Sequence, residues 1–144
     1  MNVIFDVDGT LMDIEHRRHH VNNGNNNWTA FEDEMINDCP NHAIMDIALG
    51  MVKNGHEIVI VSARNKRHKA ITETQLHDAG LYFSQLFVRE DDDFRPDEVF
   101  KQDVLDALIA VDWKPDLVFD DRDSVVKMWR KNGLVCAQVA EGAF

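Results

Sequence analysis

Five short apolar segments, separated by longer stretches with helical periodicity, constrain the fold of this 144-residue chain more than any other feature. The segments are rich in β-branched and aromatic residues, and they are Val3–Phe5, Glu57–Val61, Leu86–Val88, Leu117–Phe119 and the weaker Val135–Val139. Nearly continuous apolar runs of this length are typical of strands that are buried on both faces, as in a parallel sheet.

Helical patterns lie between these segments, and most of them are followed by a glycine. They cover residues 44–52, 69–79, 96–109 and 124–131, with Gly55, Gly80 and Gly133 as stop signals and Pro96 as a start signal. Strands that alternate with helices require crossover connections, which are right-handed in a parallel sheet. The sequence therefore predicts an α/β fold with a doubly wound, mostly parallel sheet.

Residues 13–41 interrupt this alternation, because the stretch is polar and rich in asparagine. A short helix is expected to begin at Thr29, since Thr29 and Glu32 have the spacing of a capping box. We interpret the stretch as a small cap inserted after the first strand, within a single domain that covers residues 1–144.

Aromatic residues give further expectations about packing. Trp28 and Phe31 are expected to anchor the insertion on the sheet, although Trp28 could instead stack on a nucleic-acid base. Trp113 and Trp129 are expected in the core or between helices.

Two aspartates, Asp6 and Asp8, directly follow the first predicted strand. Being two residues apart on an extended chain, they point to the same side, at the carboxyl end of a strand where open α/β sheets bind ligands. Adjacent carboxylates repel each other, so the pair needs a cation or a shared proton, and Mg²⁺ is the cation that suits oxygen ligands beside phosphate. A calcium loop of the EF-hand type does not fit, because its glycine is the sixth residue whereas Gly9 is fourth from Asp6.

Other polar residues follow the later strands in the same way. Ser62 comes at the end of the second strand, Lys101 lies in the opening turn of the third main helix, and the pair Asp120 and Asp121 follows the fourth strand. These positions converge on one edge of a parallel sheet.

Taken in order, the motif Asp6-Val7-Asp8-Gly9-Thr10, Ser62, Lys101 and Asp120-Asp121 resemble the four motifs of the haloacid dehalogenase superfamily. A narrower similarity, to the 3′-phosphatase domain of phage polynucleotide kinase-phosphatase, is carried by residues 59–64, 95–101, 120–130 and 138–144. The kinase loop GxxxxGK[ST] does not occur in the sequence. The resemblance therefore implies a stand-alone phosphatase of the kind that phage genomes encode, with a role in nucleic-acid repair.

The superfamily resemblance implies a mechanism. Asp6 would attack phosphorus to form an aspartyl phosphate, and Asp8 would protonate the leaving oxygen and then accept a proton from water. Asp8 would need a raised pKa to carry that proton. The implied ligands of Mg²⁺ are the Asp6 carboxylate, the backbone carbonyl of Asp8, and the pair Asp120 and Asp121.

The remaining implied roles concern the phosphate and the substrate. Ser62 and Lys101 would hold phosphate oxygens, and the hydroxyl of Thr10 would assist. The narrower similarity adds Arg64 and Arg17 as contacts to phosphate or the substrate backbone, and it adds Asp97. One helical turn before Lys101, Asp97 could orient the lysine ammonium or could simply complement the helix dipole.

The net charge of −11 excludes a uniformly basic face for nucleic acid and favours a bound cation. The basic run at residues 16–20 is an exception on this acidic chain. We expect a Mg²⁺-dependent phosphomonoesterase that removes 3′-phosphates from nucleic-acid ends, with a separate kinase or ligase as partner. A nucleotidase or small-molecule phosphatase is the first alternative, and a non-catalytic module that binds nucleic-acid ends is the second.

The cysteines and histidines form no recognisable metal motif. Cys39 and Cys136 are far apart and do not predict a disulfide, whereas His16 and His20 have a spacing that could ligate zinc on a helix but lack a third ligand at a known spacing. No signal peptide or membrane-spanning run is recognisable, so a cytoplasmic location is expected.

Overall fold

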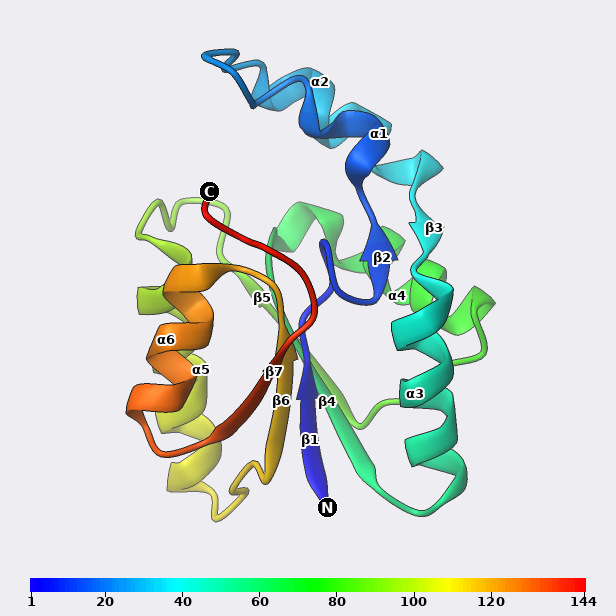
Figure 1. Cartoon of the computed structure of the whole chain (residues 1–144), viewed down its shortest axis with the longest axis vertical. Helices are drawn as coiled ribbons and strands as arrows, with labels where there is room; N and C mark the ends of the chain where they lie inside the picture. Colours follow the sequence, from blue (N-terminus) through cyan, green and yellow to red (C-terminus); the bar gives the residue numbers. More distant parts are fainter.

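A computed structural model describes residues 1–144 and has a five-stranded parallel sheet at its centre (Figure 1). The strands are β1 (Asn2–Phe5), β4 (Glu57–Asn65), β5 (Gln85–Arg89), β6 (Leu117–Asp120) and β7 (Val135–Gln138). Their order is β5-β4-β1-β6-β7, and every neighbouring pair is parallel. The predicted α/β fold with a doubly wound sheet is confirmed.

Two helical layers cover the sheet, and each encloses its own apolar cluster. The helices α3 (His42–Lys53) and α4 (Lys69–Asp78) lie on one face, and α5 (Asp97–Ala110) and α6 (Asp123–Lys131) lie on the other (Figure 1). Val3 and Phe5 of β1 belong to the first cluster, and Ile4 belongs to the second. Burial on both faces explains why the strands have continuous apolar sequences.

The predicted core positions of two tryptophans agree with the structure. Trp129 is fully buried in the cluster under α5 and α6, and Trp113 packs against the same cluster. Cys136 is buried there as well, whereas Cys39 is exposed, and neither cysteine is in a disulfide. No helix in the structure has both the length and the apolar character needed to cross a membrane.

The insertion lies beyond the carboxyl ends of the strands, above β1 in Figure 1. It begins and ends in two short antiparallel strands, β2 (Met12–Asp13) and β3 (Cys39–Pro40). Between them it carries the helices α1 (Glu15–Arg18) and α2 (Trp28–Asp33) and the 3-10 helix η1 (Glu34–Asn37).

Two expectations about the insertion were wrong. The helix α2 begins at Trp28 instead of Thr29, because the side chain of Asn27 caps it by accepting a hydrogen bond from the backbone N–H of Ala30. Trp28 is also not an anchor, since it is 54% exposed and contacts Phe31 edge to face at 5.6 Å between ring centroids.

The sheet order places a switch point at the carboxyl end of β1. The chain leaves β1 to build β4 and β5 on one side and later β6 and β7 on the other. Open α/β sheets bind ligands where the strand order reverses in this way. The residues that follow β1, β4 and β6 therefore face a common site beneath the insertion.

Candidate active site

Three buried carboxylates meet at this edge of the sheet. One oxygen each from Asp6, Asp120 and Asp121 lies within 4.8 Å of the others. Burial raises the pKa of Asp6 well above its usual value, and burial together with Asp120 raises the pKa of Asp121 to about 6. Three carboxylates this close together repel one another when they are ionised. A hard divalent cation such as Mg²⁺ fits a compact cluster of carboxylate oxygens and would remove the repulsion between them.

Lys101 lies between two of these carboxylates. Its ammonium donates hydrogen bonds of 2.8 Å to Asp6 Oδ1 and of 2.8 Å to Asp120 Oδ2. Burial lowers the pKa of Lys101, but Asp120 and Asp6 raise it more, so the net pKa lies above the usual value and the lysine stays charged. Lys101 is the fifth residue of α5, so it starts the second turn and not the first.

The other oxygen of Asp6 is also held. The hydroxyl of Thr10 donates to Asp6 Oδ2 at 3.1 Å. Trp129 Nε1 donates to Asp120 Oδ2 at 3.1 Å from α6, which fixes the neighbouring carboxylate. The two candidate metal ligands at the ends of β1 and β6 are therefore oriented by groups from the core.

Gly9 allows the loop after β1 to approach the acidic cluster. Its φ is +79°, a conformation that favours glycine, and a Cβ here would lie 2.2 Å from Asp121 Oδ2. The same Cβ would lie 3.0 Å from Arg18 Nη2. A side chain at this position would therefore displace Asp121.

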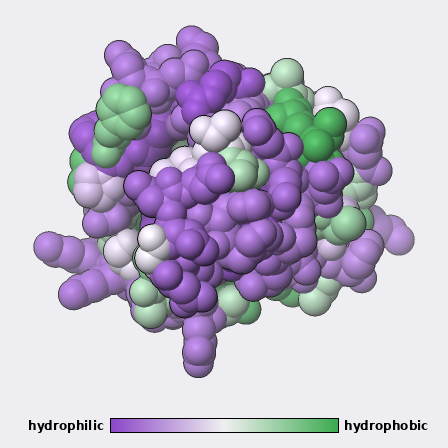
Figure 2. Space-filling view, turned by 90° about the horizontal axis from the view of Figure 1, so that it is seen from above, coloured by the Kyte–Doolittle hydropathy of each residue, from purple (hydrophilic) through white to green (hydrophobic).

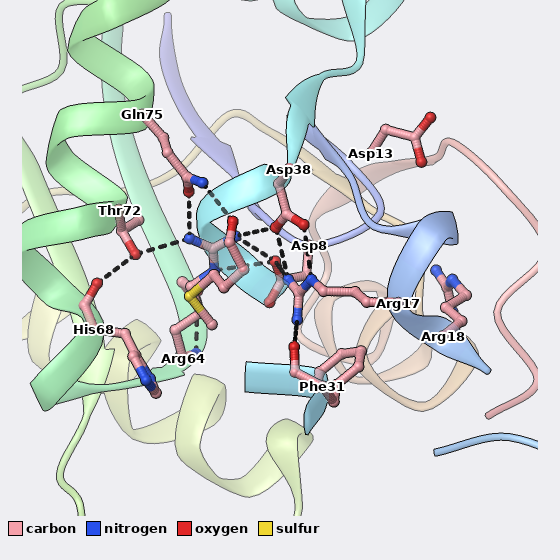
Figure 3. A network of polar contacts seen from close by, with 12 residues as sticks. Asp8, Asp13, Arg17, Arg18, Phe31, Asp38, Arg64, His68, Thr72 and Gln75 are labelled. Atoms are coloured by element: carbon pink, nitrogen blue, oxygen red, sulfur yellow. Dashed lines mark hydrogen bonds and ion pairs between the residues drawn. The ribbon is translucent and has the colours of Figure 1, made fainter. Parts of the chain in front are cut away.

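Asp8 lies against two buried arginines, Arg17 and Arg64 (Figure 3). Arg64 donates to Asp8 Oδ1 from Nη2 at 2.7 Å and from Nε at 3.0 Å, and Arg17 Nη2 donates to the same oxygen at 3.0 Å. Both arginines also bind Asp38, whose side chain is fully buried. The arginines thus come from α1 and β4 and meet between two carboxylates.

The expectation that Asp8 has a raised pKa was wrong for this arrangement. Burial raises the pKa of Asp8, but the positive charges of Arg64, Arg17 and Lys101 lower it by more than burial raises it. The net pKa therefore lies below the usual value. Opposite charges within hydrogen-bond distance favour the ionised carboxylate. Asp8 is therefore ionised before any substrate enters.

Asp38 is a site residue that the sequence analysis missed. It accepts hydrogen bonds from Arg17 Nε at 2.8 Å and Nη2 at 2.7 Å, and from Arg64 Nη2 at 2.9 Å. His16 Nε2 lies 2.7 Å from its Oδ1. Asp38 lies in a polar stretch and is one of 26 acidic residues in the whole chain, and its partners are 21 and 26 positions away in sequence. It therefore carried no local signal of its own.

Ser62 and Asp97, two residues expected at the substrate site, are bound to other protein groups. Ser62 was expected at the end of the second strand, but it is buried inside β4, which continues to Asn65. Its hydroxyl accepts a hydrogen bond of 3.1 Å from the backbone N–H of Arg64. Asp97 accepts hydrogen bonds from Arg89 at 2.6 Å and from Arg122 at 2.5 Å. The side chains of Asp97 and Lys101 form no hydrogen bond or ion pair with each other, so the expected orientation of the lysine by Asp97 is not seen.

His16 and His20 both lie near Glu34, and His16 also contacts Asp38. The distances to Glu34 Oε2 are 3.9 Å from His16 Nδ1 and 3.2 Å from His20 Nε2. The one cluster of three or more potential metal ligands is that of Asp6, Asp120 and Asp121. This arrangement does not favour the zinc alternative.

Replacing Asp38 by alanine is expected to destabilise the protein strongly. Two buried guanidiniums would lose a shared carboxylate, and removing one partner of a buried ion pair costs about 3–5 kcal/mol. Urea unfolding of Asp38→Ala measures this as a lower midpoint with an unchanged m-value. The control Asp103→Ala removes an exposed partner of Arg95 and should cost at most about 1 kcal/mol. Equal midpoints for the two variants would contradict the role of Asp38.

The comparisons with known proteins agree with this geometry. The family described as the phosphatase domain of polynucleotide kinase PNKP matches residues 1–144. A chain in the structure of the Pnkp1/Rnl/Hen1 RNA repair complex is 27% identical with a TM-score of 0.81, over 99% of this chain and 43% of that one. This chain therefore spans less than half of that relative.

More distant structures share the fold. A hydrolase from Streptococcus pneumoniae TIGR4 is 14% identical with a TM-score of 0.64, over 97% of this chain and 92% of that one. A Had-superfamily hydrolase from Ehrlichia chaffeensis is 16% identical with a TM-score of 0.60, over 95% and 85% of the two chains.

Proposed function

This chain belongs to the family of polynucleotide kinase PNKP phosphatase domains, within the haloacid dehalogenase superfamily, and we propose that it removes 3′-phosphates from nucleic-acid ends. It is a phosphatase by family, and the finer assignment is ours. The observation that supports it concerns two aspartates. Asp6 is buried in the candidate cation cluster and bound by Lys101, and Asp8 is bound by Arg17 and Arg64.

In the proposed reaction Asp6 is the nucleophile. Its carboxylate oxygen forms a bond to phosphorus while the bond from phosphorus to the 3′-oxygen breaks, and Asp8 gives that oxygen a proton. Water then attacks the aspartyl phosphate and passes a proton to Asp8, which releases inorganic phosphate and restores Asp6. Mg²⁺ bound to Asp6, Asp120, Asp121 and the Asp8 carbonyl would neutralise charge on the transferring phosphate.

The arginines around Asp8 explain how an ionised aspartate can become an acid. Arg17 and Arg64 hold the Asp8 carboxylate in its charged form in the free protein. An incoming phosphate competes for the same guanidiniums, which prefer planar contacts to oxyanions. Once these hydrogen bonds shift to the phosphate, burial raises the pKa of Asp8, so the proton is taken up when substrate is present.

The remaining predicted residues support phosphate binding. Lys101 would move from Asp6 towards a phosphate oxygen while keeping Asp120 as its partner, and the Ser62 hydroxyl lies beside Arg64 at the end of β4. Asp97 is assigned a supporting role, since it holds Arg122 directly after the metal-ligand pair. Thr10 keeps Asp6 aligned for attack.

Two further observations favour a polymeric substrate. The relative in the RNA repair complex is described as part of an assembly with Rnl and Hen1, and a separate kinase or ligase would complete repair for this chain. The face above the strand ends is largely hydrophilic, with only isolated apolar areas (Figure 2).

The net charge of −11 favours the competing proposal, a nucleotidase, because a strongly negative protein repels a long polyanion.

A comparison of substrates decides between these proposals. Phosphate release is measured from a 3′-phosphorylated oligonucleotide, the same oligonucleotide with a 5′-phosphate, and nucleoside monophosphates, all with Mg²⁺. We expect kcat/KM to be highest for the 3′-phosphorylated oligonucleotide, by about tenfold or more, because contacts outside the reacting phosphate strengthen binding of the transition state. Preference for mononucleotides would favour the nucleotidase, and binding without turnover would favour a non-catalytic module.

A further inference from the structure

Arg18, from the basic run at residues 16–20 of the insertion, borders the candidate metal site. It follows Arg17 on α1, and consecutive residues of a helix point about 100° apart, so the two guanidiniums diverge. Arg17 reaches Asp8 and Asp38, whereas Arg18 Nη2 lies 3.4 Å from Asp121 Oδ2. Arg18 therefore faces the metal side of the site.

The hydrogen-bond donors of Arg18 are mostly unused. A guanidinium has five N–H donors, and Arg17 and Arg64 spend theirs on buried carboxylates and on neutral oxygens. Arg18 makes one hydrogen bond, the long contact to Asp121. Its Nε lies 2.6 Å from a Glu15 oxygen without the alignment of a hydrogen bond, so this buried nitrogen has no hydrogen-bond partner.

A bound cation would weaken the interaction of Arg18 with Asp121. Asp121 is a candidate metal ligand, so a cation would compete with Arg18 for the charge of this carboxylate. The guanidinium remains in place because it lies 4.4 Å from the centroid of the Phe144 ring. Its other anion, Glu15, has a side chain that is 74% exposed and is therefore a weak partner.

The neighbouring arginine does not compete for this role. The Arg122 guanidinium lies 5.1 Å from the centroid of the same Phe144 ring, but its Nη1 binds Asp97 and its Nε binds the Phe144 carbonyl. Arg18 is thus a partly exposed cation, 15% accessible in its side chain, with spare donors next to the reaction centre. Spare guanidinium donors in such a position match the oxygens of a phosphate.

We propose that Arg18 binds the phosphate next to the reacting 3′-phosphate, that is, the phosphate on the 5′-oxygen of the terminal nucleoside. The inference rests on the proposed function and adds a specificity-determining residue to it. The reacting phosphate already has Lys101, Arg17 and Arg64 available, and the last two are too deeply buried to reach a second phosphate. Arg18 lies at the rim and provides that second contact.

The test compares two substrates that differ by one phosphate, a nucleoside 3′-phosphate and the corresponding nucleoside 3′,5′-bisphosphate. The protein should prefer the bisphosphate in kcat/KM by about tenfold, the scale of one charge-assisted contact. Arg18→Gln should remove this preference. Both substrates use the same nucleophile and cation, so any effect of the substitution on the acidic cluster cancels in the ratio.

A matched control and a binding measurement complete the test. Arg67→Gln removes an exposed arginine that is paired with Glu32 and Asp91, and it should keep the preference. In an Asp6→Asn background with Mg²⁺, affinity for a labelled 3′-phosphorylated single strand is measured against salt. Adding Arg18→Gln should reduce the log–log slope by about 0.7, the value for one phosphate contact.

The outcomes separate the two proposals. Retained preference in Arg18→Gln, an equal loss in Arg67→Gln, or an unchanged salt slope would overturn the role of Arg18. Hydrolysis of both substrates without preference by the unmodified protein would also overturn it and would leave the phosphatase proposal standing. If no 3′-phosphate is hydrolysed, the proposed function fails and the inference about Arg18 falls with it.

Discussion

Asp6→Asn protein is expected to be folded and almost inactive. The substitution preserves the shape of the side chain but removes the charged oxygen that would attack phosphorus, so kcat should fall by about 10⁴-fold or more, as for other lost nucleophiles. Phosphate release from a 3′-phosphorylated oligonucleotide measures the loss, and circular dichroism reports the fold. Lys101 keeps Asp120 as a charged partner, so the core should remain intact.

The control for this prediction is Asp116→Asn. Asp116 is exposed, lies just before β6 and accepts a hydrogen bond from the backbone N–H of Asn2, at the opposite end of the sheet from the site. Its substitution should leave turnover close to that of the unmodified protein. Substantial turnover by folded Asp6→Asn protein would rule out the aspartyl-phosphate mechanism.

Removal of divalent cations is expected to abolish activity, and Mg²⁺ should restore it. The cluster of Asp6, Asp120 and Asp121 concentrates negative charge where a phosphate must enter, so a cation is needed before substrate can bind. Ca²⁺ should not substitute, because it accepts more ligands and a looser geometry than in-line transfer needs. Activity in excess chelator, followed by titration with each cation, is the measurement. Full activity in chelator would refute the assigned site.

The same cation should stabilise the protein more at neutral than at acidic pH. Because folding raises the pKa of Asp121 to about 6, this group binds more protons in the native state than in the unfolded state from about pH 4 to about pH 6, and the raised pKa of Asp6 acts in the same direction. Stability without metal therefore falls as pH rises through this window. Mg²⁺ needs the deprotonated ligands, so its effect on Tm should be larger at about pH 7.5 than at about pH 5. Asp8, with a lowered pKa, contributes stability that is lost only at lower pH.

The sequence by itself determined the sheet and the acidic cluster. Continuous apolar runs such as Ile58–Val61 specify strands buried on both faces, because each residue of the run has a helix above or below it. Asp6, Asp120 and Asp121 could be placed together because they directly follow strands whose carboxyl ends meet at one edge. These features depend on local patterns and on the general geometry of parallel sheets.

Only the tertiary structure decided the ionisation state of Asp8 and the hydrogen-bond partners of the arginines around that cluster. Asp8 has a lowered pKa because Arg17 and Arg64 arrive from α1 and β4, and Asp38 joins them from the end of the insertion. Whether an arginine is saturated, like Arg17, or has spare donors, like Arg18, depends on partners far away in the sequence. Electrostatic and hydrogen-bond energies vary steeply with distance and burial, and no local pattern of residue types encodes either quantity.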